Sequence, residues 1–98
     1  MRTLNYAGCE LVTSDGVADA LLDYVVTLPL NRPPERVTIP ALQEGRPVVA
    51  RFLVTALTPL LVTTAERVDE PLEGEDRAID VLRHKAHRLD SVGYDLRD

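Results

Sequence analysis

The chain has 98 residues, of which 45% are hydrophobic and 28% are charged, and its formal net charge at pH 7 is −5. This length and composition predict one folded domain spanning residues 1–98, large enough to bury a core without disulfides or metals. The acidic balance argues against nucleic acid and anionic membrane surfaces as partners, because phosphate contacts require a basic stripe.

Cys9 is the only cysteine, so no disulfide can form within one chain. We expect it to occupy a small, buried apolar position in a strand. No stretch approaches 18 uninterrupted apolar residues, and the first ten residues lack the apolar core of a signal peptide. These features predict a cytoplasmic protein that is not associated with a membrane.

The first predicted strand covers residues 9–13, where β-formers alternate moderately with polar residues. Leu4 and Tyr6 either extend this strand or belong to a separate strand that precedes it. Gly8 marks a possible bend between the two segments. The sequence therefore leaves the number of N-terminal strands open at one or two.

A helix is predicted next, with Ser14 or Asp15 as its N-cap and Pro29 as the residue that stops it. Its apolar arc covers more than half of the circumference, which is wider than a helix resting on one sheet requires. We therefore expect this helix to contact two other elements. The predicted apolar positions are Val17, Ala18, Leu21, Leu22, Tyr24, Val25 and Leu28.

A β-hairpin is predicted from the alternation in residues 37–42 and 48–54. Pairing Leu42 with Pro47 places the apolar sets of both strands on the same side of the sheet. The loop is then 43–46, in which Gly45 suits a left-handed backbone position. Proline at position 40 cannot donate a ladder hydrogen bond, which predicts that its strand lies at a sheet edge or contains a bulge.

Residues 60–66 are predicted to form the third strand of this meander, in one of two registers. With a four-residue loop, Leu61 lies on the same side as Phe52, and Leu60 and Val62 lie on the second face. With a loop that is one residue shorter, these assignments are reversed.

A final helix is predicted from Glu75 to Ser91, with Gly93 just after its end. The element order is therefore β–α–β–β–β–α. Antiparallel strands combined with helices gathered on one face predict an α+β two-layer sandwich. The predicted core positions of this helix are Ile79, Leu82, Ala86 and Leu89.

Residues that could carry chemistry are sparse. Asp76, Asp80, His84 and His87 share one helical face, which we interpret as the solvated side and not as a metal site. The acidic loop 66–76 does not match the ligand spacing of a calcium loop. Because no nucleophile elbow, phosphate loop or dinucleotide motif is present, we predict no catalytic residues and no cofactor.

Val49, Arg51 and Leu53 are predicted to lie on the second sheet face, facing away from the helices, together with either Leu60 and Val62 or Leu61. Contiguous exposed apolar surface is typical of an interaction site. Arg51 is interpreted either as a surface residue lying over apolar neighbours or as an interface charge.

The sequence therefore favours a non-catalytic interaction module that forms a homodimer through this second face. The proposed interface residues are Val49, Arg51, Leu53, Leu60 and Val62. One alternative is an acidic adaptor or chaperone-like protein that binds another protein through the same face. Another is a small-ligand binder or enzyme with a pocket between helix and sheet, although no polar residues converge there in the sequence.

Overall fold

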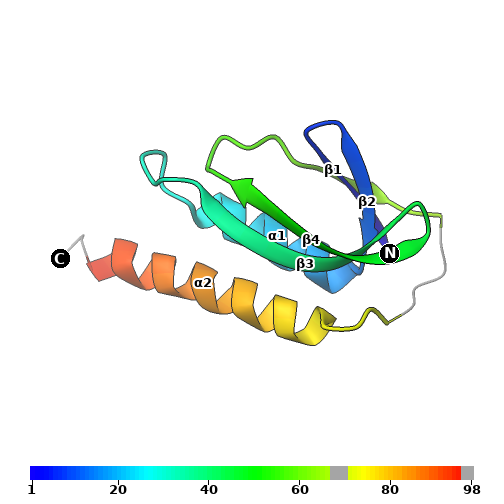
Figure 1. Ribbon diagram of the computed structural model, residues 1–98. Coiled ribbons are helices and arrows are strands. Elements are labelled where there is room, and N and C mark those ends of the chain that lie inside the picture. The colour runs from blue at the N-terminus through cyan, green and yellow to red at the C-terminus, as the bar shows by residue number, and fades with distance from the viewer. Residues whose placement is uncertain (67–70, 96–98) are drawn as a thin grey trace.

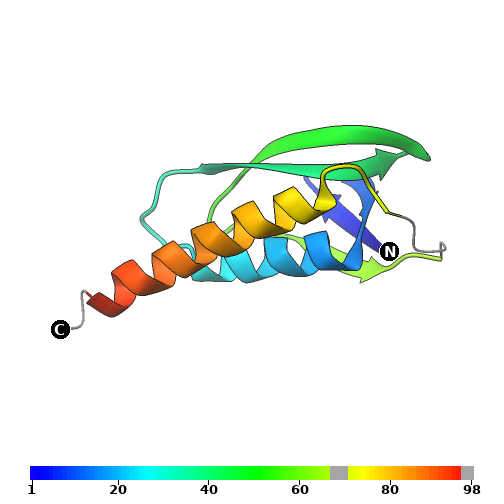
Figure 2. The ribbon, with the colours of Figure 1, turned by 90° about the horizontal axis from the view of Figure 1, so that it is seen from below.

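The computed structural model describes residues 1–66 and 71–95, with side chains up to residue 89. The elements in chain order are β1 (Arg2–Tyr6), β2 (Cys9–Thr13), α1 (Asp15–Thr27), β3 (Glu35–Gln43), β4 (Arg46–Val54), β5 (Leu61–Thr64) and α2 (Glu75–Asp95). The strands form an antiparallel sheet in the order β4–β3–β2–β1–β5. Both helices lie side by side on one face of this sheet, so the predicted α+β two-layer fold is confirmed (Figure 1, Figure 2).

The N-terminal segment forms two strands, which resolves the alternative left open by the sequence. Tyr6 pairs with Cys9 across a turn formed by Ala7 and Gly8, whose φ angles are 49° and 84°. Positive φ at both central residues is the signature of the tight turn that matches strand twist. Because Cys9 follows this turn at the hairpin tip, its side chain is exposed, and the prediction that it is buried is wrong.

Helix α1 begins as predicted, because the Ser14 hydroxyl oxygen accepts a hydrogen bond of 3.1 Å from the Val17 backbone N–H. The helix is central to the core and contacts both the sheet and α2, which explains its wide apolar arc. Leu21 and Tyr24 are almost completely buried there, at 0% and 1% exposure. The expectation that this helix contacts two elements is therefore confirmed.

The β3–β4 hairpin has the predicted register, with Leu42 paired to Pro47 and Val37 paired to Phe52. The connection is shorter than predicted, because positions 43 and 46 also pair. Only Glu44 and Gly45 remain in the turn, with φ angles of 52° and 79°. The left-handed conformation predicted for Gly45 is confirmed.

The third strand of the predicted meander is wrongly placed by the sequence argument. β5 pairs with β1 at the opposite edge of the sheet and not with β4, with Leu4 opposite Val62. Because cross-strand partners share a face, Val62 points to the same side as the buried Leu4. Leu60 and Val62 accordingly pack against the core, and Leu61 points outward with 58% exposure.

Proline at position 40 lies in a strand that is not a sheet edge, so the edge prediction is wrong. β3 has β4 on one side, and on the other it pairs with β2 at Val12↔Leu42. Beyond that pair β2 ends, and the Thr13 hydroxyl donates a hydrogen bond of 2.8 Å to the Pro40 carbonyl oxygen. The Pro40 backbone therefore faces away from β4, and its missing N–H removes no bond between β3 and β4.

We expect Thr13→Val to lower the free energy of unfolding by about 1 kcal/mol, because the buried hydroxyl that ties β2 to β3 is removed while the side-chain shape is kept. Urea denaturation measures the change. Thr27→Val is the control, because its hydroxyl bonds a carbonyl within its own helix. An effect of Thr13→Val no larger than that of the control would contradict a role for this hydrogen bond in holding the two strands together.

Helix α2 continues past Ser91 and through Gly93 to Asp95, so the predicted end at Ser91, with Gly93 just after it, is wrong. The predicted core stripe is confirmed: Leu82 is 2% exposed, and Ile79, Ala86 and Leu89 pack against the core. The long helix lies beside α1 and extends beyond it at the C-terminal end (Figure 2).

Candidate functional site

Three of the five predicted interface residues lie together on the outer face of β4. Val49 and Leu53 are 61% and 55% exposed, and Arg51 is exposed between them. We call these three residues the β4 face. Leu60 and Val62 do not belong to it, because the pairing of β5 with β1 turns them toward the core.

Some backbone hydrogen-bonding groups on the free edge of β4 are already bonded or are missing. The Leu53 carbonyl oxygen accepts a 2.6 Å hydrogen bond from the Tyr6 hydroxyl, and Tyr6 also contacts the Phe52 ring. Proline at position 47 provides no N–H, and Arg51 places a charge in the middle of the strand. These are the features by which natural sheets discourage the addition of another strand. The apolar face of β4 is therefore more available than its edge.

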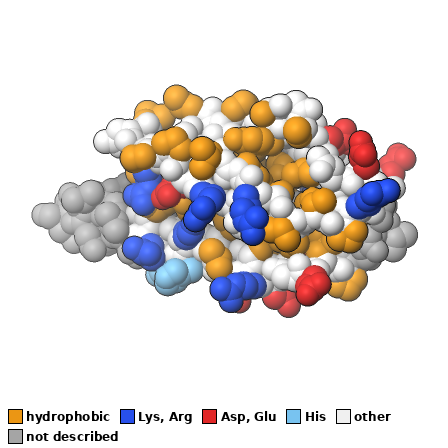
Figure 3. All heavy atoms as spheres, viewed as in Figure 1, with side chains coloured by type: hydrophobic (Ala, Val, Ile, Leu, Met, Phe, Trp, Pro, Cys, Tyr) orange, Lys and Arg blue, Asp and Glu red, His pale blue; other side chains and the backbone are white. Residues whose placement is uncertain are grey.

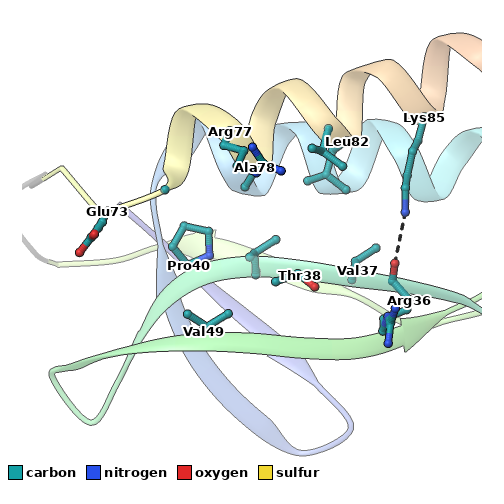
Figure 4. Close-up of a pocket in the computed structure, with 13 residues that line it drawn as sticks. Arg36, Val37, Thr38, Pro40, Val49, Glu73, Arg77, Ala78, Leu82 and Lys85 are labelled. Carbon is teal, nitrogen blue, oxygen red and sulfur yellow. Dashed lines mark hydrogen bonds between the residues drawn. The ribbon is translucent and has the colours of Figure 1, made fainter.

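A groove of about 380 Å³ lies between β3 and α2 (Figure 4). Its walls come from two segments that are far apart in the sequence. β2 pairs with β3 only at Val12↔Leu42, and where β2 diverges, the edge of β3 lies beside the first half of α2. Ala78 and Leu82 form an apolar wall on the helix side, and Val81 is 43% exposed at its margin. The described residues that line the groove are Arg36, Val37, Thr38, Ile39, Pro40, Val49, Glu73, Gly74, Arg77, Ala78, Val81, Leu82 and Lys85.

The groove is locally basic in a chain whose net charge is −5. Among the described residues that line it, Arg36, Arg77 and Lys85 are basic and Glu73 alone is acidic. In the part of the chain that the structure describes, none of the three cations forms an ion pair. Figure 3 shows Lys and Arg side chains in a row across this face, where β3 and α2 adjoin in Figure 1.

Lys85 closes one end of the groove. Its ammonium lies 3.4 Å from the Arg36 carbonyl oxygen and 5.9 Å from the centre of the Tyr24 ring (Figure 4). Burial, and then the negative charge of Glu35, raises the pKa of the Tyr24 phenol, so this ring is neutral at pH 7. Tyr24 therefore offers Lys85 an aromatic face and not a counter-charge.

Sequence reasoning missed this groove. The signal available in the sequence was Arg77, Val81 and Lys85, which are spaced four residues apart and therefore share one side of a helix. Nothing in the sequence indicates that Arg36, more than forty positions earlier, lies opposite them. The contact depends on how α2 packs beneath β3.

The acidic and histidine positions on α2 are separate from both surfaces. Asp76, Asp80, His84 and His87 are all exposed, as expected for the solvated side of the helix. Within residues 1–66 and 71–89, no three potential metal ligands come close enough to hold an ion. Residues 67–70, which belong to the acidic loop 66–76 predicted from the sequence, lie outside the described residues.

Comparison of the chain with protein-family models, with curated proteins and with solved structures found no match in any of the three. Among the helices described, none has the length and apolar character needed to cross a membrane.

Proposed function

We propose that the protein is a non-catalytic interaction module that associates with a second copy of itself through the β4 face. The observation that carries this proposal is the exposure of Val49 and Leu53, two large apolar side chains on one face of an edge strand. Exposed apolar side chains that cluster in this way mark interaction surfaces in soluble proteins. Two copies related by a two-fold axis present the same surface to each other.

Face-to-face packing explains the chemistry of the β4 face better than strand addition does. Proline at position 47 and the bonded Leu53 carbonyl weaken the edge, whereas Val49 and Leu53 stand on the outer face. The aliphatic stem of Arg51 covers apolar surface between them while its guanidinium reaches the rim. Sheets that pack through their faces bury alternate residues in this manner.

We expect the wild-type chain to sediment at twice 10.9 kDa at micromolar concentration, and Leu53→Asp to sediment as a monomer. A carboxylate placed at the centre of an apolar interface loses solvation without gaining a partner. Equilibrium sedimentation measures both masses. Val26→Asp is the control, because Val26 is 83% exposed but lies on α1.

The Val26→Asp variant should remain dimeric, and circular dichroism should show both variants folded. A wild-type chain that stays monomeric throughout the concentration range would overturn the proposal. The competing hypothesis, an adaptor that binds another protein through the same face, would then require a partner whose binding is lost in Leu53→Asp and kept in Val26→Asp.

A further inference from the structure

The edge of β3 that faces α2 carries backbone groups with no partner strand. The Arg36 carbonyl accepts from Lys85, and the carbonyl of its ladder partner Leu53 accepts from Tyr6, so this pair does not bond across the hairpin. Because bonded and non-bonded pairs alternate in an antiparallel ladder, the N–H and C=O of Thr38 also point away from β4. Within the described residues, the Thr38 groups have no hydrogen-bond partner at this edge.

On both sides of Thr38, the backbone groups of β3 are less available for pairing with an added strand. Pro40 has no N–H, and its carbonyl is bonded to the Thr13 hydroxyl. Lys85 occupies the Arg36 carbonyl at 3.4 Å, which is a long and weak contact. A chain that adds to this edge therefore pairs with Thr38 at its centre, where one residue can both donate to and accept from β3.

The groove beside this edge has the shape that strand addition requires. One wall is a strand edge, the other is a helix presenting Ala78, Val81 and Leu82, and the volume of about 380 Å³ is within the range of ligand pockets. A strand edge facing a helix is the arrangement in which several domain classes bind an extended peptide. The backbone supplies hydrogen bonds, and the helix wall receives alternate side chains.

The charges select among possible occupants. Arg36, Arg77 and Lys85 line the groove without an acidic partner in the described residues, and Glu73 stands at one end. We infer that the β3–α2 groove binds an extended, acidic peptide segment of a partner protein, which adds to β3 as a short strand centred on Thr38. This binding site shares only Val49 with the β4 face, and it goes beyond self-association.

The geometry also specifies the pattern of that segment. Successive side chains of a strand point to opposite faces. On an added strand, one set points inward between β3 and the helix wall of Ala78 and Leu82, and it must be apolar. The other set points outward with the side chains of Arg36 and Thr38, and acidic residues there lie on the same side as Arg36. The segment therefore alternates apolar and acidic residues.

The test is a titration of the full chain with the capped pentapeptide Glu-Val-Glu-Val-Glu, in which the central glutamate lies opposite Thr38, followed by the backbone amide signals in NMR. We expect the Thr38 amide to shift and to gain protection from hydrogen exchange, together with shifts at Ala78 and Val81. Arg77→Glu should weaken binding roughly fivefold or more, because an attractive contact becomes repulsive. Arg88→Glu is the matched control, since Arg88 is exposed on the same helix outside the groove.

Two further peptides separate the contributions to binding. Replacing every glutamate by glutamine should weaken binding if charge selects the occupant. Replacing only the central glutamate by proline should weaken binding by more than the loss of one charge explains if the peptide adds as a strand, because proline has no N–H to donate to the Thr38 carbonyl. Equal binding of either peptide, or equal effects of Arg77→Glu and Arg88→Glu, would overturn the inference. Laurate that binds the groove while the peptide does not would also overturn it, in favour of a small amphipathic anion.

The same titration on Leu53→Asn separates this inference from self-association. Leu53 does not line the groove, and asparagine places no charge beside its cross-strand partner Arg36, so this replacement should leave peptide affinity unchanged even if it changes the oligomeric state. Loss of peptide binding in this folded variant would mean that the groove depends on the second copy and would contradict a site contained in one chain.

Discussion

Replacing Leu82 by alanine is expected to lower the free energy of unfolding by about 2–5 kcal/mol. Leu82 is 2% exposed and belongs to the core cluster that includes Leu21 and Tyr24 of α1 and Ile39 of β3. Truncation removes the apolar contacts of Leu82 with α1 and with the sheet at the same time. The three elements are held in place by other contacts, so the resulting cavity closes only partially.

The matched control is Val81→Ala, one position earlier on the same helix. Val81 is 43% exposed and lies at the margin of the β3–α2 groove, so its truncation should cost less than about 1 kcal/mol. Chemical denaturation, analysed with one shared m value for all variants, gives the change in the free energy of unfolding for each substitution. Comparable losses for Leu82→Ala and Val81→Ala would contradict the orientation of α2 on the sheet, and with it the position of the groove.

Gly16→Val is expected to destabilise the fold by about 1–3 kcal/mol through overpacking between the two helices. A Cβ atom at Gly16 would stand 2.8 Å from the Cδ1 atom of Ile79 on α2, so the neighbouring side chain must move. Alanine requires only a shift of the tip of Ile79, and it gains about 0.5–1 kcal/mol in helix propensity. Gly16→Ala should therefore lie close to wild type.

The cause can be isolated by repeating both substitutions in an Ile79→Ala background. With the long side chain removed, the added penalty of Gly16→Val should largely disappear, which a double-mutant cycle measures as a coupling energy. A penalty that is unchanged in this background would place its origin in α1 itself, in the lower helix propensity of valine, and not in the packing of α1 against α2.

The local elements could be predicted because their signals lie within short segments. Alternation in residues 37–42 and 48–54, together with Gly45 in the connection, predicts the register of the β3–β4 hairpin, although the turn is shorter than the predicted loop 43–46. The N-cap at Ser14 and the helical spacing of Leu82 and its neighbours are equally local. In each case the interacting residues are close in sequence, so few alternative pairings compete.

The position of β5 could not be predicted in this way. Alternation shows that Leu60 and Val62 share one face and that Leu61 takes the other, but it does not show which strand lies alongside. Pairing with β1 gives that strand a neighbour on each side and packs Val62, which is partly buried, opposite Leu4. The candidate interface loses two of its five residues because of this single long-range choice.

Patterns within short segments were enough to predict the α+β class, the apolar faces of both helices and the hairpin that carries Val49, Arg51 and Leu53. Tertiary structure decided which of the remaining apolar residues are exposed, and it created the groove between β3 and α2. The physical reason is that period and turn chemistry act over a few residues. The free edge at Thr38 and the cations of β3 and α2 meet only after β2 diverges from β3 and α2 packs beside it.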